Sequence, residues 1–210
     1  MFIDWTYVVL VLPAVIFSIW CSARVQSTFK KYSAVPTRRG VTGADAARRV
    51  LDANGLTDVR IERVAGNLTD HYDPRTNVIR LSDAVYDNAS VAAIGVAAHE
   101  TGHALQYAKG YAPIQIRSAI LPATRIGSTL APYLVIAGLI FSFYPLAYAG
   151  IALFTLAVLF QLVTLPVEFN ASARALRALE GNGMMTQEEL DGAKRVLTAA
   201  AMTYVAALFM

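Results

Sequence analysis

The sequence has little cysteine, histidine or charge. Cys21 is the single cysteine, so no intrachain disulfide can form, and we expect its side chain to pack as a small apolar group. Charged residues make up 16% of the 210 residues and hydrophobic ones 56%, which is too apolar for an average soluble domain. No internal repeat, phosphate-binding loop or glycine-rich dinucleotide turn is present. We therefore expect a membrane protein rather than a nucleotide-binding one.

Two of the three histidines lie four residues apart, in an alanine-rich stretch that predicts a helix. Residues at this spacing share one helix face, so His99 and His103 can both bind one tetrahedral ion. Glu100 lies off that face, close enough to take a proton from a water molecule at an open coordination position. A chance HExxH pattern in a chain of this length is roughly a one-in-a-hundred event. The pattern predicts a zinc peptidase site.

A catalytic zinc site needs a third protein ligand. The remaining histidine, His71, lies upstream, and the downstream acids are Glu168, Glu180, Glu188, Glu189 and Asp191. The last four belong to a polar stretch in which Thr186 and Glu189 predict a capping box, and we interpret them as solvated surface charge. Glu168 instead follows a long apolar run, where an unpaired carboxylate is costly. We assign it as the third ligand; the alternative is a hydrated carboxylate or one paired with Arg174.

Three uncharged stretches predict membrane segments. The first runs from about Trp5 to Trp20. The residues before it include Asp4 but no Lys or Arg, which disfavours a cleaved signal peptide. The region from Ile126 to Val167 is broken near Tyr144–Leu146 and predicts a helical hairpin, because each half can cross about 30 Å. The final run, Val196–Met210, covers only about 22 Å. It either dips into the bilayer, packs on the hairpin or belongs to a helix whose remainder is missing from this chain.

Basic residues predict the orientation. They flank the apolar segments on one side, which puts the N-terminus outside and the loop of residues 22–125, with the HExxH site, in the cytoplasm of a multi-pass protein of the cell membrane. These clusters lack interleaved aromatic residues, so we expect lipid headgroups and no nucleic acid as their partners. The residues concerned are Arg24, Lys30, Lys31, Arg38, Arg39, Arg117, Arg125, Arg174 and Arg177.

The fold class that we predict is a mainly α, integral membrane helical protein with a small α+β, zincin-like cytoplasmic metallopeptidase unit. Its expected parts are a transmembrane helix (1–23), the cytoplasmic unit (24–125), the hairpin (126–167) and a third-ligand helix with a C-terminal apolar helix (168–210). Within the unit we expect a helix that is capped by Thr42, ends at Gly55 and buries Ala46, Ala47, Val50 and Leu51. We expect strands at Val59–Val64 and Val78–Leu81, with a turn at Asp73–Asn77 between them. The metal helix should run from Asp87 or Asn88 to Gly110.

Four stretches carry a resemblance to a known family: Leu68–Pro74, Ala97–Ala104, Phe160–Ser172 and Thr203–Ala207. Through them nearly the whole chain resembles the membrane neutral zinc metallopeptidases of the YugP type, within the wider gluzincin group. The resemblance implies a membrane-embedded, zinc-dependent endopeptidase acting on proteins or peptides. It implies His99, His103 and Glu168 as zinc ligands and Glu100 as the general base.

The chain departs from gluzincins at large in one respect. Many of them carry Asp four residues after the ligand Glu, to orient a ligand histidine, whereas this chain has Ser172, with Asn170 as another possible orienting residue. The resemblance also implies that Val78–Leu81 is a sheet edge on which substrate is laid; an ordinary core strand is the alternative. His71 is a candidate for polarising the scissile carbonyl, against a purely local hydrogen bond, and Tyr204 is a weaker candidate, against a membrane-facing aromatic.

Two other functional classes are compatible with part of the pattern. A zinc-binding membrane scaffold would keep the ligands without peptidase turnover. A transporter would need polar or ionisable groups within the membrane segments, and the stretch from Ile126 to Val167 has few, chiefly Ser142, Gln161 and Thr164. The physiological substrate and the oligomeric state are left open by the sequence.

Overall fold

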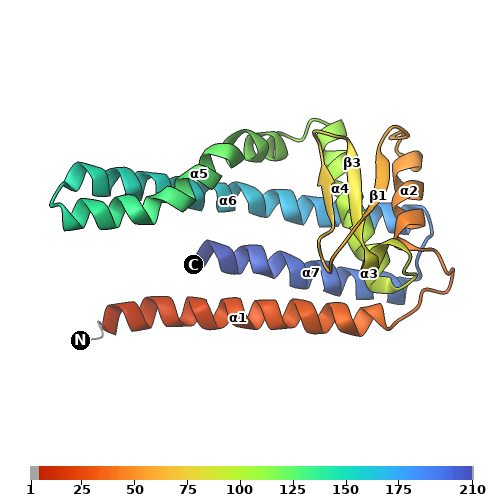
Figure 1. Ribbon diagram of the computed structural model, residues 1–210. Coiled ribbons are helices and arrows are strands. Elements are labelled where there is room, and N and C mark those ends of the chain that lie inside the picture. The colour runs from red at the N-terminus through yellow and green to blue at the C-terminus, as the bar shows by residue number, and fades with distance from the viewer. Residues whose placement is uncertain (1–4, 210) are drawn as a thin grey trace. The chain divides into compact units, whose positions relative to one another are not determined.

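The computed structural model describes residues 5–209; Asp4 and the last residue of the predicted C-terminal run lie outside the described residues. The chain is mainly helical, as predicted (Figure 1). Its elements in order are α1 (Trp5–Ser33), α2 (Gly43–Ala53), β1 (Arg60–Val64), β2 (His71–Asp73), β3 (Val78–Ser82), α3 (Asp83–Tyr86), α4 (Val91–Ala108), α5 (Ala112–Ile140), α6 (Tyr144–Gly181) and α7 (Gln187–Phe209).

The chain divides into two compact units. One comprises Met1–Gly110 together with Glu168–Met210, and the other is Tyr111–Val167. Helix α6 contributes to both, because its residues from Glu168 onward belong to the first unit. Within the described residues, three stretches are long and apolar enough to cross a membrane: Val8–Ser33, Ala112–Ile140 and Tyr144–Gly181.

The second unit is a helical hairpin of α5 and the first part of α6. A side chain at Gly138 would place its Cβ 2.5 Å from the backbone nitrogen of Ala147, so the close approach of the two helices requires glycine there. The turn lies at residues 141–143, where Ser142 has φ 50°. The break predicted at Tyr144–Leu146 was therefore placed too late. Pro145 lies in the first turn of α6, where its missing N–H has no helical partner to lose.

The first unit holds a three-stranded sheet in the order β1-β3-β2. Strand β3 is central, parallel to β1 and antiparallel to β2, with Tyr72 opposite Ile79. Of the two alternatives for Val78–Leu81, the core strand is confirmed and the sheet edge was wrong, because both edges of β3 are already paired. The edge strand β2 was not predicted, since its three residues directly precede the turn and have no alternating pattern long enough to recognise.

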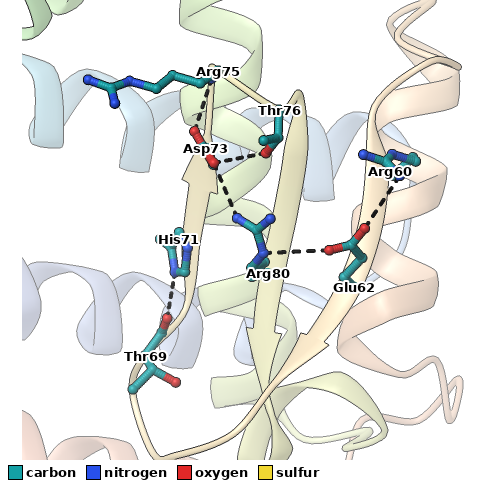
Figure 2. A network of polar contacts seen from close by, with 8 residues as sticks. All are labelled: Arg60, Glu62, Thr69, His71, Asp73, Arg75, Thr76 and Arg80. Carbon is teal, nitrogen blue, oxygen red and sulfur yellow. Dashed lines mark hydrogen bonds and ion pairs between the residues drawn. The ribbon is translucent and has the colours of Figure 1, made fainter.

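The two faces of this sheet differ in polarity. Ile79 and Leu81 are fully buried and pack with apolar residues of α2 and α4. The other face carries a row of charges, shown in Figure 2: Arg80 lies 3.5 Å from Glu62 and 3.3 Å from Asp73. The apolar face thus anchors the sheet on the helices that precede and follow it.

Capping residues and glycines determine where α2 and α4 begin and end. Thr42 and Asp45 form the capping box of α2, as the predicted Thr42 cap requires, and Gly55 follows its end with φ 75°. Helix α4 begins later than predicted, because the short helix α3 and its cap Asp87 come first. Its N-cap is Ser90, whose hydroxyl accepts from the N–H of Ala93 at 3.3 Å. Gly110, with φ 62°, terminates the helix as expected.

Helix α7 contains the predicted C-terminal run and packs along α1 and α4 (Figure 1). It runs antiparallel to α1: a Cβ on Gly192 would lie 2.8 Å from the Tyr32 ring, and the rings of Phe17 and Phe209 meet edge to face at 6.3 Å. The Thr186–Glu189 capping box is confirmed. The interpretation of Glu189 as solvated was wrong, because it is 8% exposed and also accepts from the N–H of Arg38.

Candidate metal centre

Helix α4 presents the two histidines of the HExxH pattern on one face, as its 3.6-residue period requires. The rings of His99 and His103 meet edge to face with their centroids 4.8 Å apart. His103 is buried and His99 is partly exposed. Local helix geometry therefore brings both imidazoles to the same face of α4.

Glu168 of α6 meets both histidines. Its Oε2 atom lies 3.2 Å from Nε2 of His99 and 3.6 Å from Nε2 of His103. One ligand atom from each of the three residues lies within 4.8 Å of the other two. The Glu168 side chain is only 2% exposed, so water does not compensate its charge. A carboxylate buried against two imidazoles is the arrangement expected of a cation site.

A glycine permits this approach of α6 to α4. A Cβ at Gly102, between the two histidines, would lie 2.4 Å from the carbonyl oxygen of Ala171. No side chain fits there without moving backbone. Because Ala171 follows Glu168 by less than one helical turn, the contact fixes the height at which Glu168 stands beside the histidines.

The other ring nitrogen of each histidine has a hydrogen-bonding partner. Nδ1 of His99 lies 3.1 Å from the hydroxyl of Ser172, and Nδ1 of His103 lies 3.0 Å from Oε1 of Gln106. In both rings Nε2 is the nitrogen that faces Glu168. Ser172 thus takes the orienting position expected from the spacing, with a hydroxyl in place of the usual carboxylate.

A relay of hydrogen bonds sets the tautomer of His103. Arg174 can only donate, so the atom of Asn170 at 2.7 Å from its Nε is the acceptor oxygen Oδ1. The same oxygen lies 3.1 Å from Nε2 of Gln106, which therefore donates. Oε1 of Gln106 then faces His103, whose Nδ1 must donate. The Nε2 lone pair of His103 is left for a metal ion.

Glu100 lies beside the histidines and is only 7% exposed. Burial raises the pKa of its carboxyl group to about 7, because desolvation disfavours the ionised form. The charges of Glu168 and Asp70 act in the same direction, while His99 and the backbone N–H of Tyr72 favour ionisation. A carboxyl group with a pKa near neutrality is suited to taking up and releasing a proton.

A cavity of about 190 Å³ opens onto these residues. His99, Glu100 and Glu168 line it together with Tyr204 of α7 and Asp70, which directly precedes β2. The rest of its wall is mainly small and apolar. It comes mostly from α1, α4 and α7, with Val25, Val96, Val196, Leu197, Ala200 and Ala201, and is completed by Leu68 and Ser172. The cavity can therefore accept an apolar group next to the candidate metal centre.

Sequence reasoning missed two residues of the site. Asp70 accepts from the N–H of Ser82 at 2.7 Å and from its hydroxyl, and burial raises the pKa of its carboxyl group. No local pattern indicated that it would lie in the cavity. Gln106 could have been found, because residues three apart on a helix are neighbours and His103 was already a candidate ligand.

The two candidates for stabilising the oxyanion lie in different places. Tyr204 lines the cavity. His71 is exposed, and its Nδ1 donates to the carbonyl oxygen of Thr69 at 2.8 Å, as Figure 2 shows. It is not among the residues that line the cavity within the described part of the chain. The local hydrogen bond weighed against a catalytic role for His71 is therefore present.

The donor set fits zinc. Two imidazole nitrogens and one carboxylate oxygen are a common protein ligand set of catalytic zinc sites. Ligand atoms about 2.0 Å from a tetrahedral ion lie about 3.3 Å apart, close to the observed separations of 3.2 and 3.6 Å. The hydrogen bonds on both Nδ1 atoms supply the orientation that zinc-binding histidines need.

Residues 7–210 match a family described as "Putative neutral zinc metallopeptidase". The chain is 48% identical over 201 residues to a Bacillus subtilis (strain 168) protein named "Putative membrane protease YugP". The alignment covers 96% of this chain and 89% of that protein. No solved structure matches the chain significantly.

Proposed function

Because this chain belongs to the zinc metallopeptidase family that it matches, we propose that it is a membrane-bound, zinc-dependent endopeptidase. The observation that carries the proposal is the convergence of His99, His103 and Glu168, with Glu100 buried in the same cavity. In this proposal the first three residues hold the ion and Glu100 is the catalytic base. The family and the relative's name support the class of reaction, and the geometry supports the assignment of roles.

The residues divide the reaction between them. Zinc, when bound, supplies Lewis-acid activation of water and of the scissile carbonyl. Glu100 takes the proton from the attacking water and returns it to the nitrogen of the leaving amine, so the amide C–N bond breaks with no net change in the protonation of the enzyme. Ser172 and Gln106 keep the imidazoles of His99 and His103 oriented throughout.

Strand β2 is the proposed support for the substrate backbone. It is an edge strand, it packs near α4, and the N–H of Tyr72 faces Glu100. An extended peptide added to such an edge gains main-chain hydrogen bonds that do not depend on its sequence. The apolar wall of the cavity would then favour an apolar substrate side chain next to the cleaved bond.

Tyr204 is the proposed stabiliser of the oxyanion. It reaches the cavity from α7, on an element different from those that carry the ligands and the base. A phenolic O–H can donate to an oxygen on which negative charge develops. His71 is the less suitable candidate, since its ring lies on the exposed face of β2.

The proposed location is the cell membrane, as a multi-pass protein with the metal centre on the cytoplasmic side. Three described helices can cross a bilayer by length and composition. The distribution of Lys and Arg favours the cytoplasm for the residues that follow α1.

The decisive experiment compares wild-type protein with Glu100→Gln, both purified in detergent. We expect one zinc per chain in both, hydrolysis of a casein-type substrate by the wild type, and a loss of at least about a thousandfold in the variant. Wild-type protein that binds zinc without any hydrolysis would instead support the scaffold function. Wild-type protein without zinc affinity would refute both.

A further inference from the structure

A second depression lies between α1 and α7 and shares no lining residue with the metal cavity. It is a groove of about 780 Å³, lined only by residues of these two helices. Arg24 and Lys31 lie on its α1 side, and Lys194 and Arg195 on its α7 side. The one carboxylate in its lining is Asp191. The groove therefore carries four cationic side chains against one acidic one.

The four cations have no ionic partner among residues 5–209. Arg24 lies over the ring of Trp20, with its guanidinium carbon 5.2 Å from the centroid, and Lys31 lies 5.5 Å from that of Tyr32. No ion pair to a carboxylate is formed by any of them in the described part of the chain. Like charges gathered in one groove repel one another, and a bound anion would relieve this repulsion.

The groove begins where the apolar part of α1 ends. The nineteen residues from Trp5 to Ala23 carry no charge and cover about 28 Å, close to the thickness of a hydrocarbon layer. Arg24 follows immediately, and Lys31 lies about 10 Å further along the helix axis. Headgroups occupy roughly 5–8 Å on each side of a bilayer. The cations of α1 thus extend from the inner boundary of the headgroup layer at Arg24 to just beyond its outer boundary at Lys31.

Apolar and hydrogen-bonding groups flank the cations. Trp20, at the membrane end of the groove, is 48% exposed, and Ile16 and Ile19 nearby on α1 are 58% and 65% exposed. Tryptophan at this depth is typical of a membrane interface. The hydroxyl groups of Thr28 and Thr198 also line the groove and can donate to phosphate oxygens. An apolar surface at one end and cations at the other match the two parts of a lipid molecule.

We propose that this groove is a binding site for the phosphate headgroup of an anionic phospholipid. Arg24, Lys31, Lys194 and Arg195 contact the phosphate, and Trp20 and the exposed isoleucines of α1 contact the glycerol and acyl region. A free phosphate ion would use the cations alone and leave the apolar flank without a role. The site is separate from the metal cavity, since no residue lines both.

Trp20 provides the assay. The chain has two tryptophans, so Trp5→Phe leaves Trp20 as the single tryptophan. The full-length variant in detergent micelles is titrated with phosphatidylglycerol, with phosphatidylcholine or with soluble glycerol phosphate. We expect a saturable change of Trp20 emission with phosphatidylglycerol and at least about tenfold higher concentrations for the other two. Equal responses to phosphatidylglycerol and phosphatidylcholine, or to glycerol phosphate, would overturn the proposal.

A pair of charge-matched variants separates the groove from general attraction to anionic lipid. Lys31→Gln/Arg195→Gln removes two cations of the groove, and Lys30→Gln/Arg75→Gln removes two exposed cations outside it. We expect phosphatidylglycerol affinity to fall at least about tenfold in the first and less than about threefold in the second. Equal losses in both would refute a defined site. Circular dichroism checks the fold, and the single change Arg195→Gln replaces the double variant if that variant does not fold.

Discussion

At the scale of single residues, the candidate metal centre depends on which nitrogen of each imidazole carries the proton. The relay from Arg174 through Asn170 and Gln106 leaves Nε2 of His103 unprotonated without the help of an ionised carboxylate. Such orienting partners influence the affinity for zinc, because a misoriented or wrongly protonated imidazole must rotate or change its tautomer before it can bind the ion.

Gln106→Leu tests this relay. Leucine is similar in size to glutamine but cannot accept the hydrogen bond from Nδ1 of His103. We therefore expect zinc affinity to fall about 10- to 100-fold. Competition with a chromophoric chelator measures it. Gln26→Leu, at an exposed glutamine of α1, is the control and should bind zinc like the wild type. Unchanged affinity in Gln106→Leu would mean that the relay does not orient the ligand.

Substitutions of Tyr204 and His71 should affect kcat differently in the same assay. If Tyr204 donates to the oxyanion, Tyr204→Phe lowers kcat about 100-fold with little change in KM, because the donor matters only as charge develops. His71→Ala should keep kcat within about twofold, since its ring is exposed and bonded locally. Steady-state kinetics on a fluorogenic peptide measures both. The reverse pattern would move the role to His71.

The buried Glu100 predicts a pH-dependent stability of the metal-free protein. Its folded pKa of about 7 exceeds the usual 4.5, so the folded state holds a proton that the unfolded state releases between these values. The stability from this group is complete below about pH 4.5 and declines as pH rises to about 7, by up to about 3 kcal/mol.

Glu100→Gln isolates that contribution, because glutamine stays neutral. Thermal unfolding of both chelator-treated proteins in detergent should show Tm values that agree at about pH 4. The variant should then become progressively more stable than the wild type up to about pH 7.5. A difference in Tm that stays constant over this range would show that Glu100 titrates normally.

At the scale of elements, the contact of α4 with α6 places the third ligand. Gly102→Ala would put a methyl group 2.4 Å from a backbone oxygen, so the two helices must separate. We expect a loss of about 1–3 kcal/mol of stability and of at least about tenfold in zinc affinity. Gly181→Ala, where a Cβ meets nothing within 4 Å, is the control. Thermal unfolding and chelator competition measure the two effects, and normal zinc affinity in Gly102→Ala would contradict the role given to this contact.

Two of the three strands of the sheet were predicted from the sequence, but their order was not. The alternating stretch that became β1 and the strand Val78–Leu81 were recognised from their pattern. Their order was not, because strand order depends on pairing between distant segments rather than on local periodicity. The three residues of β2 occupy the edge position, which was one of the two alternatives for Val78–Leu81. The proposed substrate support therefore moved from a buried strand to one beside Glu100.

At the scale of the whole molecule, the proposed topology can be tested with the single cysteine. Cys21→Ala gives a cysteine-free background, in which Asn67→Cys marks the loop before β2 and Ser142→Cys marks the hairpin turn; both positions are exposed. A membrane-impermeant maleimide should label position 142 in intact cells and position 67 only after lysis. Labelling of position 67 in intact cells would place the metal centre outside.

The sequence by itself determined the features that depend on local periodicity and composition. A helix brings residues four apart onto one face, so the juxtaposition of His99 and His103 followed from HExxH alone. Uncharged stretches of membrane length likewise predicted the three candidate spans. The capping residues Thr42 and Thr186 predicted where two helices begin.

Only the tertiary structure decided which distant groups share the site. Glu168 was a plausible ligand, but its position beside both imidazoles depends on the packing of Gly102 against Ala171, which are 69 residues apart in the chain. Asp70 and Tyr204 reach the cavity from still other elements, and the groove between α1 and α7 combines cations from both ends of the sequence. Contacts between segments far apart in the chain arise from the packing of whole faces, and the periodicity of one segment does not reveal which other segment it packs against.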